Sequence, residues 1–307
     1  MLILERRKFL KSSIALSALP LVGFSGETVA APDKSEPLNN RFKISLNAYS
    51  FNAPLRSGKT NLEEVVEFCA AQGFDALDPT GYYFPGYPEV PSDEYIYKLK
   101  RKAHQLGVAI SGTGVRNDFT QPDQITRTKE IEFIKRWIEV AAKLSAPVIR
   151  IFAGTSLPEK FSGEEITDWI TKDIKTCVEY GKEHGVIVAL QNHNDFIKTA
   201  DQAIDLIKKV NSEWFGLVLD TGSFVTNEPY SEIAKGIPYA VNWQIKEKLN
   251  YNGKIENMDL IKLFRIIQSS TYRGYLPIET LGEGDPFAII PPFLKLVRDA
   301  MEKVMNS

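Results

Sequence analysis

The stretch VIVALQNHND, residues 186–195, decides the fold of this chain. Its first part, Val186–Gln191, is a nearly continuous apolar run, which is typical of a strand buried on both faces of a parallel sheet. Gly185 comes directly before the run and ends a predicted helix over residues 166–184. Polar side chains follow the run at once. This order of helix, buried strand and polar segment indicates an α/β protein built on parallel strands.

The same strand-then-helix unit repeats from Phe42 to the end of the chain. Predicted strands cover residues 42–51, 74–79, 108–114, 147–152, 186–191, 215–220, 239–246 and 275–279. Predicted helices cover residues 62–72, 93–106, 126–144, 166–184, 200–210, 230–234, 258–269 and 287–301, the last interrupted by Pro291 and Pro292. Eight such units predict a single (β/α)8 TIM barrel over residues 42–307. A doubly wound open sheet is the alternative, but it usually has a glycine-rich loop after its first strand, and residues 45–50 contain no glycine.

Composition and charge exclude several classes of protein. The chain has 307 residues, of which 43% are hydrophobic, and a formal net charge of -2, which is typical of a soluble globular protein. Because the sequence has no basic run, it gives no indication of a positively charged surface that would bind nucleic acid. No apolar run is long enough to predict an integral membrane anchor in the mature chain. Cys69 and Cys177 both fall in predicted helices, where we expect buried thiols rather than a disulfide or a zinc site.

The N-terminal segment predicts export. Residues 5–11, ERRKFLK, precede an apolar segment over residues 14–24, and small residues follow at 29–31. Charge, apolar segment and small residues in this order are typical of a signal peptide, and the paired arginines resemble a twin-arginine motif. We therefore expect a signal peptide over residues 1–31, a polar linker over residues 32–41, and a periplasmic or otherwise exported location. A frayed basic helix is the alternative interpretation.

Polar side chains gather where the predicted strands end. Parallel barrels place their chemistry at the C-terminal ends of the strands, so these residues converge although they are distant in sequence. Asp220 alone would more simply be a helix cap, but polar groups follow four successive strands. The segments are Gln191–Asp195, Asp220–Ser223, Asn242–Glu247 and Glu279–Thr280, with Arg150 at the end of the fourth predicted strand.

These segments resemble the xylose-isomerase-like barrel family of sugar phosphate isomerases and epimerases. The family pattern has an apolar strand followed by Glu-Asn-His, and a later strand followed by His-x-Lys-Asp. The resemblance implies a divalent cation held by Glu, Asp, His and Glu. These roles fall here on Gln191, Asp220, Gln244 and Glu279.

Two of these four positions therefore depart from the family pattern. A glutamine can still coordinate through its carbonyl oxygen, but only two carboxylates remain, and the imidazole is lost. The change favours hard, oxygen-seeking ions such as Mg²⁺, Mn²⁺ or Ca²⁺ over zinc. Weak metal binding and no metal binding both remain open at this point.

The resemblance also implies proton transfer next to a carbonyl group. Gln191 cannot take a proton, so Glu279 is the predicted base, with Lys246 and His193 as candidates for its partner. His193 packed beside the barrel rim, and Lys246 in a salt bridge with Glu247 or Asp220, are the structural alternatives. Asp195 is interpreted as a cap of the following helix. The predicted substrate-binding residues are Arg150, Asn192, Trp243 and Tyr49, with Arg150 alternatively supporting the carboxylates.

The predicted partner is a small carbohydrate. Export argues against a phosphorylated sugar, so an unphosphorylated sugar, a keto-sugar or a glycoside is expected. Proton abstraction by a single base, Glu279, fits an isomerase or epimerase, and it also fits a keto-sugar lyase or hydratase. A non-catalytic carbohydrate-binding barrel is the competing interpretation. DNA-repair endonucleases of the family need more metal ligands than the three histidines of this chain allow, and a homodimer remains open.

Overall fold

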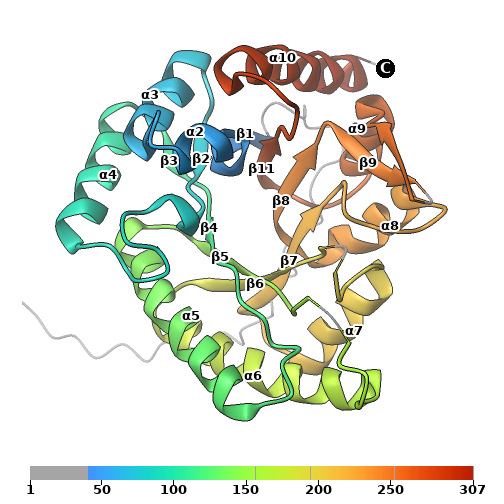
Figure 1. Cartoon of the computed structure of the whole chain (residues 1–307). Coiled ribbons are helices and arrows are strands. Elements are labelled where there is room, and N and C mark those ends of the chain that lie inside the picture. Colours follow the sequence, from blue (N-terminus) through green and yellow to red (C-terminus); the bar gives the residue numbers. More distant parts are fainter. Residues whose placement is uncertain (1–40, 156, 194, 252, 307) are drawn as a thin grey trace, which may run out of the picture. The chain divides into compact units, whose positions relative to one another are not determined.

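The computed structural model of the chain describes residues 41–306 except 156, 194 and 252. The predicted signal peptide, and the predicted linker except Arg41, lie outside the described residues. Within the described part, nine strands form one sheet in the order β3-β2-β1-β11-β8-β7-β6-β5-β4. Every pairing in this sheet is parallel, and the helices lie around the strands (Figure 1).

The third strand of the barrel consists of two short pieces. β3 (Ala109–Ile110) pairs with β2 (Ala76–Asp78), whereas β4 (Thr113–Gly114) pairs with β5 (Val148–Ile151). The two ends of the strand order are therefore consecutive in sequence, and together they close the ring of strands. The predicted single (β/α)8 barrel is confirmed.

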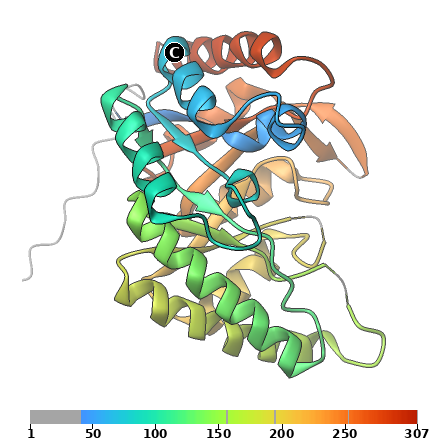
Figure 2. The same cartoon turned by 60° about the vertical axis from the view of Figure 1, so that its left-hand side comes forward.

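The remaining strands and helices follow the predicted alternation, except that α2 is an additional short helix that was not predicted. The strands are β1 (Phe42–Asn47), β6 (Ile187–Gln191), β7 (Phe215–Asp220), β8 (Ala240–Lys246) and β11 (Gly274–Glu279). The helices are α2 (Asn52–Arg56), α3 (Leu62–Gln72), α4 (Asp93–Gln105), α5 (Gln124–Leu144), α6 (Gly163–Glu183), α7 (Ala200–Val210), α8 (Pro229–Gly236), α9 (Leu260–Gln268) and α10 (Pro286–Met305). Figure 2 shows α5 and α6 side by side outside the strands, in green and yellow-green.

Side-chain caps explain why several boundaries differ from the predicted ones. The side chain of Asp123 accepts from the backbone N–H groups of Ile125 and Thr126, so α5 begins earlier than predicted. Ser162 and Glu165 form a capping box that starts α6. The first strand ends at Asn47 rather than at residue 51, because the Asn47 side chain accepts from Tyr49 N and starts the 3-10 helix over Ala48–Phe51.

Two further predictions needed correction. α10 continues through Pro291 and Pro292, where an interruption was expected. An antiparallel hairpin, β9 (Lys248–Tyr251) and β10 (Lys254–Asn257), follows β8 and was not predicted. Lys254–Asn257 contains a single apolar residue, Ile255, so it lacks the repeated apolar alternation from which a strand is predicted.

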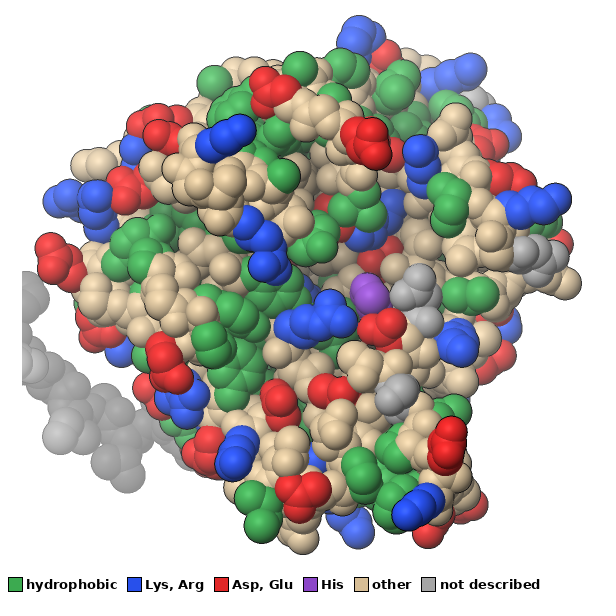
Figure 3. Space-filling view, viewed as in Figure 1, with side chains coloured by type: hydrophobic (Ala, Val, Ile, Leu, Met, Phe, Trp, Pro, Cys, Tyr) green, Lys and Arg blue, Asp and Glu red, His purple; other side chains and the backbone are tan. Residues whose placement is uncertain are grey.

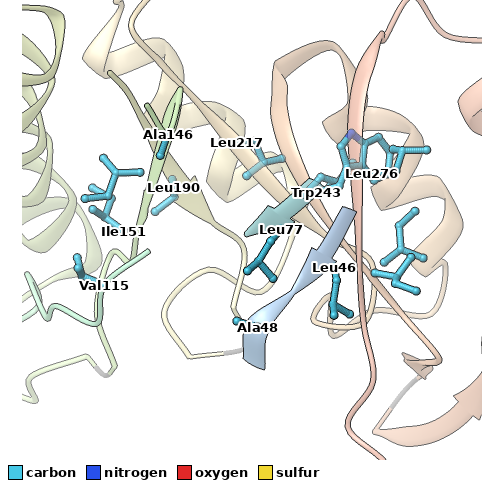
Figure 4. Packing of buried hydrophobic residues seen from close by; sticks show 14 of the residues in the cluster. Leu46, Ala48, Leu77, Val115, Ala146, Ile151, Leu190, Leu217, Trp243 and Leu276 are labelled. Atoms are coloured by element: carbon cyan, nitrogen blue, oxygen red, sulfur yellow. The ribbon is translucent and has the colours of Figure 1, made fainter. Parts of the chain in front are cut away.

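The main hydrophobic core lies between the strands and the surrounding helices. Leu190, Leu217, Trp243 and Leu276 come from four different strands and belong to this core (Figure 4). Cys69 and Cys177 are buried free thiols, as expected, and burial raises the pKa of both. No helix in the described part of the chain is long and apolar enough to cross a membrane.

Candidate active site

The ends of β6, β7, β8 and β11 bring five polar side chains together. The pairing of these strands places Asp220 beside Gln244 and Lys246 beside Glu279. Gln191 comes from the neighbouring strand β6. We call these five residues the strand-end cluster. Each of them is at least 91% buried, so their contacts are little screened by water.

Gln191 connects three members of the strand-end cluster. Its Nε2 donates to Asp220 Oδ2 and to Gln244 Oε1, both over 2.7 Å. The Asp220 carboxylate determines this amide orientation, because turning the amide would place an oxygen against a carboxylate oxygen. The other Asp220 oxygen, Oδ1, accepts from Gly222 N over 2.9 Å.

Lys246 forms the cationic centre of the strand-end cluster. Its Nζ donates to Glu279 Oε1 and lies 3.5 Å from Asp220 Oδ2. Burial alone would lower the pKa of Lys246, but the carboxylates of Asp220 and Glu279 outweigh burial and raise it. The lysine therefore stays protonated. The predicted alternative of a rim salt bridge is only partly right: the partners are Asp220 and Glu279, and the group is buried.

The Glu279 carboxylate has the properties of a base. Burial raises its pKa above the ordinary value; Lys246 lowers it, Asp220 raises it, and Arg150 lowers it, with a net upward direction. A carboxylate with a raised pKa accepts a proton more readily than an exposed one.

The strand-end cluster does not provide the donor set of the divalent site that the family resemblance implies. In the described part of the chain, no three His, Cys, Asp or Glu side chains gather in a group that could hold a metal ion. Gln191 directs N–H donors into the cluster, and the ammonium of Lys246 lies against both carboxylates. Hydrogen-bond donors and a cation repel a metal ion rather than coordinate it.

Arg150 lies beside the strand-end cluster on β5. One of its guanidinium nitrogens donates to Val115 O and to Tyr82 Oη, the latter over 2.9 Å. The guanidinium carbon also lies 4.3 Å from the centroid of the Phe152 ring, a cation–π contact. Gly114 makes this position possible, because a Cβ there would lie 2.8 Å from Arg150 Nε.

A cavity of about 160 Å³ opens directly above the strand-end cluster. Its floor includes Gln191, Gln244, Lys246 and Glu279, and the predicted residues Arg150, His193 and Tyr49 also line it. Figure 3 shows basic, acidic and histidine side chains gathered near the middle of this face. The other lining residues are Tyr82, Arg116, Phe152 and Leu281.

Arg116 and Leu281 were missed at the sequence level. Arg116 follows the third barrel strand, and Leu281 follows β11 two residues after Glu279. Applying the strand-end criterion to the third strand as well as to the later ones would have found Arg116. Leu281 has no such signal, because an isolated exposed leucine is common on protein surfaces.

A second, larger cavity of about 330 Å³ adjoins the first. His193, Lys246 and Leu281 line both cavities. The larger one extends under the β9–β10 hairpin, from which Leu249 and Ile255 line it. Together the two cavities reach the size of an ordinary small-molecule site.

His193 stands where the two cavities meet. Its Nδ1 lies 2.9 Å from Asp195 Oδ2, and its ring makes an edge contact with Phe152. Asp195 is thus a partner of His193, and its predicted role as a helix cap is wrong. Thr199 caps α7 instead, through a capping box with Gln202.

Trp243 is not a substrate-binding residue, contrary to prediction. Successive side chains of a strand alternate between its two faces, so Gln244 and Lys246 face the barrel interior and Trp243 faces the helices. Trp243 is fully buried in the main core, where its ring packs edge-on against Tyr272.

Asn192 also differs from its predicted role. It is fully buried, and its Nδ2 donates to Asp220 O over 2.8 Å while its Oδ1 accepts from Asp220 N over 2.9 Å. Both ends of the amide are used to hold the backbone of Asp220. Asn192 is therefore a positioning residue for the Asp220 carboxylate.

Asp78, which the sequence did not single out, lies in the barrel interior on β2. It accepts from Asn242 Nδ2 over 3.2 Å. Burial raises the pKa of Asp78 to about 6, with Arg150 lowering it and Glu279 raising it. Gly112 allows this packing, since a Cβ there would lie 2.9 Å from Asp78 Oδ2.

A match to a family model shows the family of the chain. The model of the xylose isomerase-like TIM barrel family matches residues 66–304, and the chain belongs to this family. The predicted family resemblance is confirmed.

Individual relatives are distant. The C-glycoside deglycosidase alpha subunit of Arthrobacter globiformis is 23% identical over 186 residues, which cover 58% of this chain and 47% of that protein. The match thus spans about half of the relative's length.

Solved structures show the same fold at low identity. A xylose isomerase domain protein from Planctomyces limnophilus has a TM-score of 0.65 at 16% identity, covering 89% of this chain and 100% of its own. D-psicose 3-epimerase from Clostridium cellulolyticum, solved with D-tagatose, has a TM-score of 0.63 at 16% identity, covering 86% and 96%.

Proposed function

We propose that the chain is an enzyme that removes a proton next to a carbonyl group of an unphosphorylated carbohydrate, as an isomerase or epimerase does. The observation that supports this proposal most directly is the pairing of Glu279, a buried carboxylate, with the ammonium of Lys246 on the floor of the smaller cavity. The family and its epimerase structures agree with this class of reaction. Export of the chain, a proposal from the sequence, agrees with an unphosphorylated substrate.

In the proposed reaction these groups have the following roles. Glu279 takes the proton from the carbon beside the carbonyl, the electron pair of the C–H bond forms a carbon–carbon double bond, and the π pair of the carbonyl moves onto its oxygen. Lys246 and Arg150 are the cationic groups that stabilise the resulting enolate oxygen. Return of a proton to the opposite face of the same carbon re-forms the carbonyl and gives the epimer. Return to the former carbonyl carbon gives the isomer, when the enolate oxygen takes up a proton and the hydroxyl on the neighbouring carbon loses one. His193, whose Nδ1 is held by Asp195, keeps Nε2 for this proton.

A keto-glycoside lyase is the second candidate function. The larger cavity, which shares His193, Lys246 and Leu281 with the smaller one, favours it, because it provides space for a group attached to the sugar. In this reaction Glu279 takes the same proton, and the electron pair expels the attached group from the next carbon. The expelled group takes up a proton from solvent or from His193. The similarity to a C-glycoside deglycosidase subunit agrees with this candidate.

Deuterium exchange tests the common first step of both reactions. The purified chain is incubated in D2O with a panel of ketoses, keto-sugars and keto-glycosides, and deuterium at the carbon beside the carbonyl is followed by NMR. We expect exchange with at least one compound. Epimer or isomer formation then distinguishes the first candidate, and release of the attached group distinguishes the second.

Two variants make the test specific. Glu279→Gln keeps the size of the side chain and should lower the exchange rate by at least about a hundredfold, because the base is removed. Glu283→Gln, an exposed position in the same connecting segment, is the matched control and should exchange like the wild type. Sugar binding without exchange across the whole panel would instead establish a non-catalytic carbohydrate-binding barrel.

A further inference from the structure

We propose that the strand-end cluster works without the divalent cation that the family resemblance implies, because Gln191 and Gln244 stand at two of its ligand positions and the Gln191 amide binds oxygens that the cation would share. The proposal concerns the same cluster as the proposed reaction but does not depend on it. Metal binding and thermal stability can be measured without any substrate.

The first observation is the direction of the Gln191 amide. At the position where the family pattern has a glutamate, Gln191 directs Nε2 toward Asp220 Oδ2 and Gln244 Oε1, at 2.7 Å from each. The carbonyl oxygen of Gln244 is therefore already engaged by an N–H group. An amide at this place joins the two neighbouring oxygens by hydrogen bonds, a task that a shared cation would otherwise perform.

The second observation is that oxygens of both carboxylates, Asp220 and Glu279, already accept hydrogen bonds from the protein. Asp220 Oδ1 accepts from Gly222 N, and Asp220 Oδ2 accepts from Gln191 and lies 3.5 Å from Lys246 Nζ. Glu279 Oε1 accepts from Lys246 Nζ. In the wild type a metal ion could bind these oxygens only by displacing the Gln191 amide and the ammonium, because the strand-end cluster has no third carboxylate to hold both cations. An ammonium displaced from both carboxylates would be a buried charge without its partners, which is strongly unfavourable.

The third observation is that Gly222 leaves space for the side chain of Lys246. A Cβ on Gly222 would lie 2.8 Å from Lys246 Cγ and 3.1 Å from Lys246 Cβ. The glycine therefore lets the lysine stem pass close to the end of β7. Lys246 also lines both cavities. An ammonium has three N–H donors; Glu279 takes one and Asp220 lies close to a second, so one remains for an oxygen of the substrate.

Metal content and thermal stability test the proposal on the full chain. After purification without chelator, we expect well under one tenth of an equivalent of Mn, Mg, Ca, Fe, Co, Ni or Zn by mass spectrometry. Addition of 1 mM MnCl2, or of EDTA, should change the Tm of the wild type by less than about 1 °C, because no metal binds the native state.

Two variants should create metal binding. Gln191→Glu combined with Gln244→His restores the ligand types of the family pattern, which also has a lysine at the position of Lys246, and adds the third carboxylate. For this double variant, 1 mM MnCl2 should raise the Tm by about 3 °C or more. Lys246→Met frees the carboxylates; its Tm should fall by several degrees, and MnCl2 should restore part of the loss. Lys235→Met removes a surface lysine that pairs with Asp201 and Glu232, and its Tm should not respond to MnCl2.

The metal measurements and the deuterium-exchange test give results that can be distinguished. A wild type that retains about one metal ion per chain, or that gains several degrees of Tm with MnCl2, overturns the proposal. If Lys246→Met does not fold, the metal content and Tm of the wild type and of the double variant still test the proposal. A wild type free of metal that nevertheless fails in the deuterium-exchange test sinks the proposed reaction and leaves the present proposal intact.

Discussion

Gly222 and Lys246 lie in direct contact at the ends of β7 and β8. A Cβ on Gly222 would lie 2.8 Å from Lys246 Cγ and 2.7 Å from the backbone oxygen of Lys248. The lysine that pairs with Asp220 and Glu279 therefore depends on a neighbour without a side chain.

Gly222→Ala should displace Lys246 and disturb the start of the β9–β10 hairpin. We expect a loss of about 1–3 kcal/mol in the free energy of unfolding, as is usual when a packed site receives an extra methyl group. The deuterium-exchange rate should fall at least tenfold. Urea unfolding and the exchange assay measure the two effects. Gly163→Ala, at a position with no atom within 4 Å of the added Cβ, is the control. Equal behaviour of both variants would contradict the proposed packing.

Asn192→Ala should show whether Asn192 holds the backbone of Asp220 or binds the substrate. The variant removes the two hydrogen bonds that hold the backbone of Asp220 and leaves buried backbone groups without partners. We expect a loss of about 1–3 kcal/mol in the free energy of unfolding. Asn257→Ala, at an exposed position of β10, should change it by less than about 0.5 kcal/mol. A substrate-binding role would instead raise KM without a change in stability.

Asp78 should make stability depend on pH. Burial raises its pKa to about 6, while Arg150 and Glu279 act on it in opposite directions. Because the folded state holds this proton more tightly than the unfolded state, the contribution of Asp78 to stability is present below pH 4. It is lost as the pH rises toward 6.

Asp78→Asn should therefore be more stable than the wild type at pH 8, by about 3 kcal/mol, with the difference shrinking toward pH 4. Chemical unfolding of both proteins between pH 4 and pH 8 provides the measurement. Asp299→Asn, on the exposed face of α10, controls for the loss of one carboxylate. A difference that is constant across this pH range would show that Asp78 does not titrate in it.

Ile255→Ser should distinguish a glycoside from a free sugar. Ile255 lines only the larger cavity, and its side chain is 66% exposed and available for contact with a bound apolar group. We expect kcat/KM to fall about tenfold for a keto-glycoside with an apolar attached group, from the lost apolar contact, and to stay unchanged for the free keto-sugar. Val225→Ser, at another exposed apolar position, is the control. Equal losses on both substrates would argue against a separate subsite.

The predicted convergence of side chains was correct where it follows from strand ends, and wrong where it depends on which face of a strand a residue occupies. Gln191, Asp220, Gln244 and Glu279 meet as expected, because parallel strands of one barrel end on one side. Trp243 is adjacent to Gln244 in sequence but faces the opposite side of β8, into the helical layer. Strict alternation along residues 242–246 would have predicted this difference.

The sequence by itself determined the alternation of strands and helices, the closed barrel, and the four positions that converge at its C-terminal end, because hydrophobic periodicity and strand ends are local properties. Only the tertiary structure decided which hydrogen-bond and ion-pair partners these side chains have. Asn242 meets Asp78 across 164 positions of the chain, and Lys246 reaches two carboxylates on two other strands. Such contacts depend on the closure of the barrel and on the absence of a side chain at Gly222. No local pattern in the sequence encodes the direction of the Gln191 amide, which is settled by the carboxylate it finds in the folded protein.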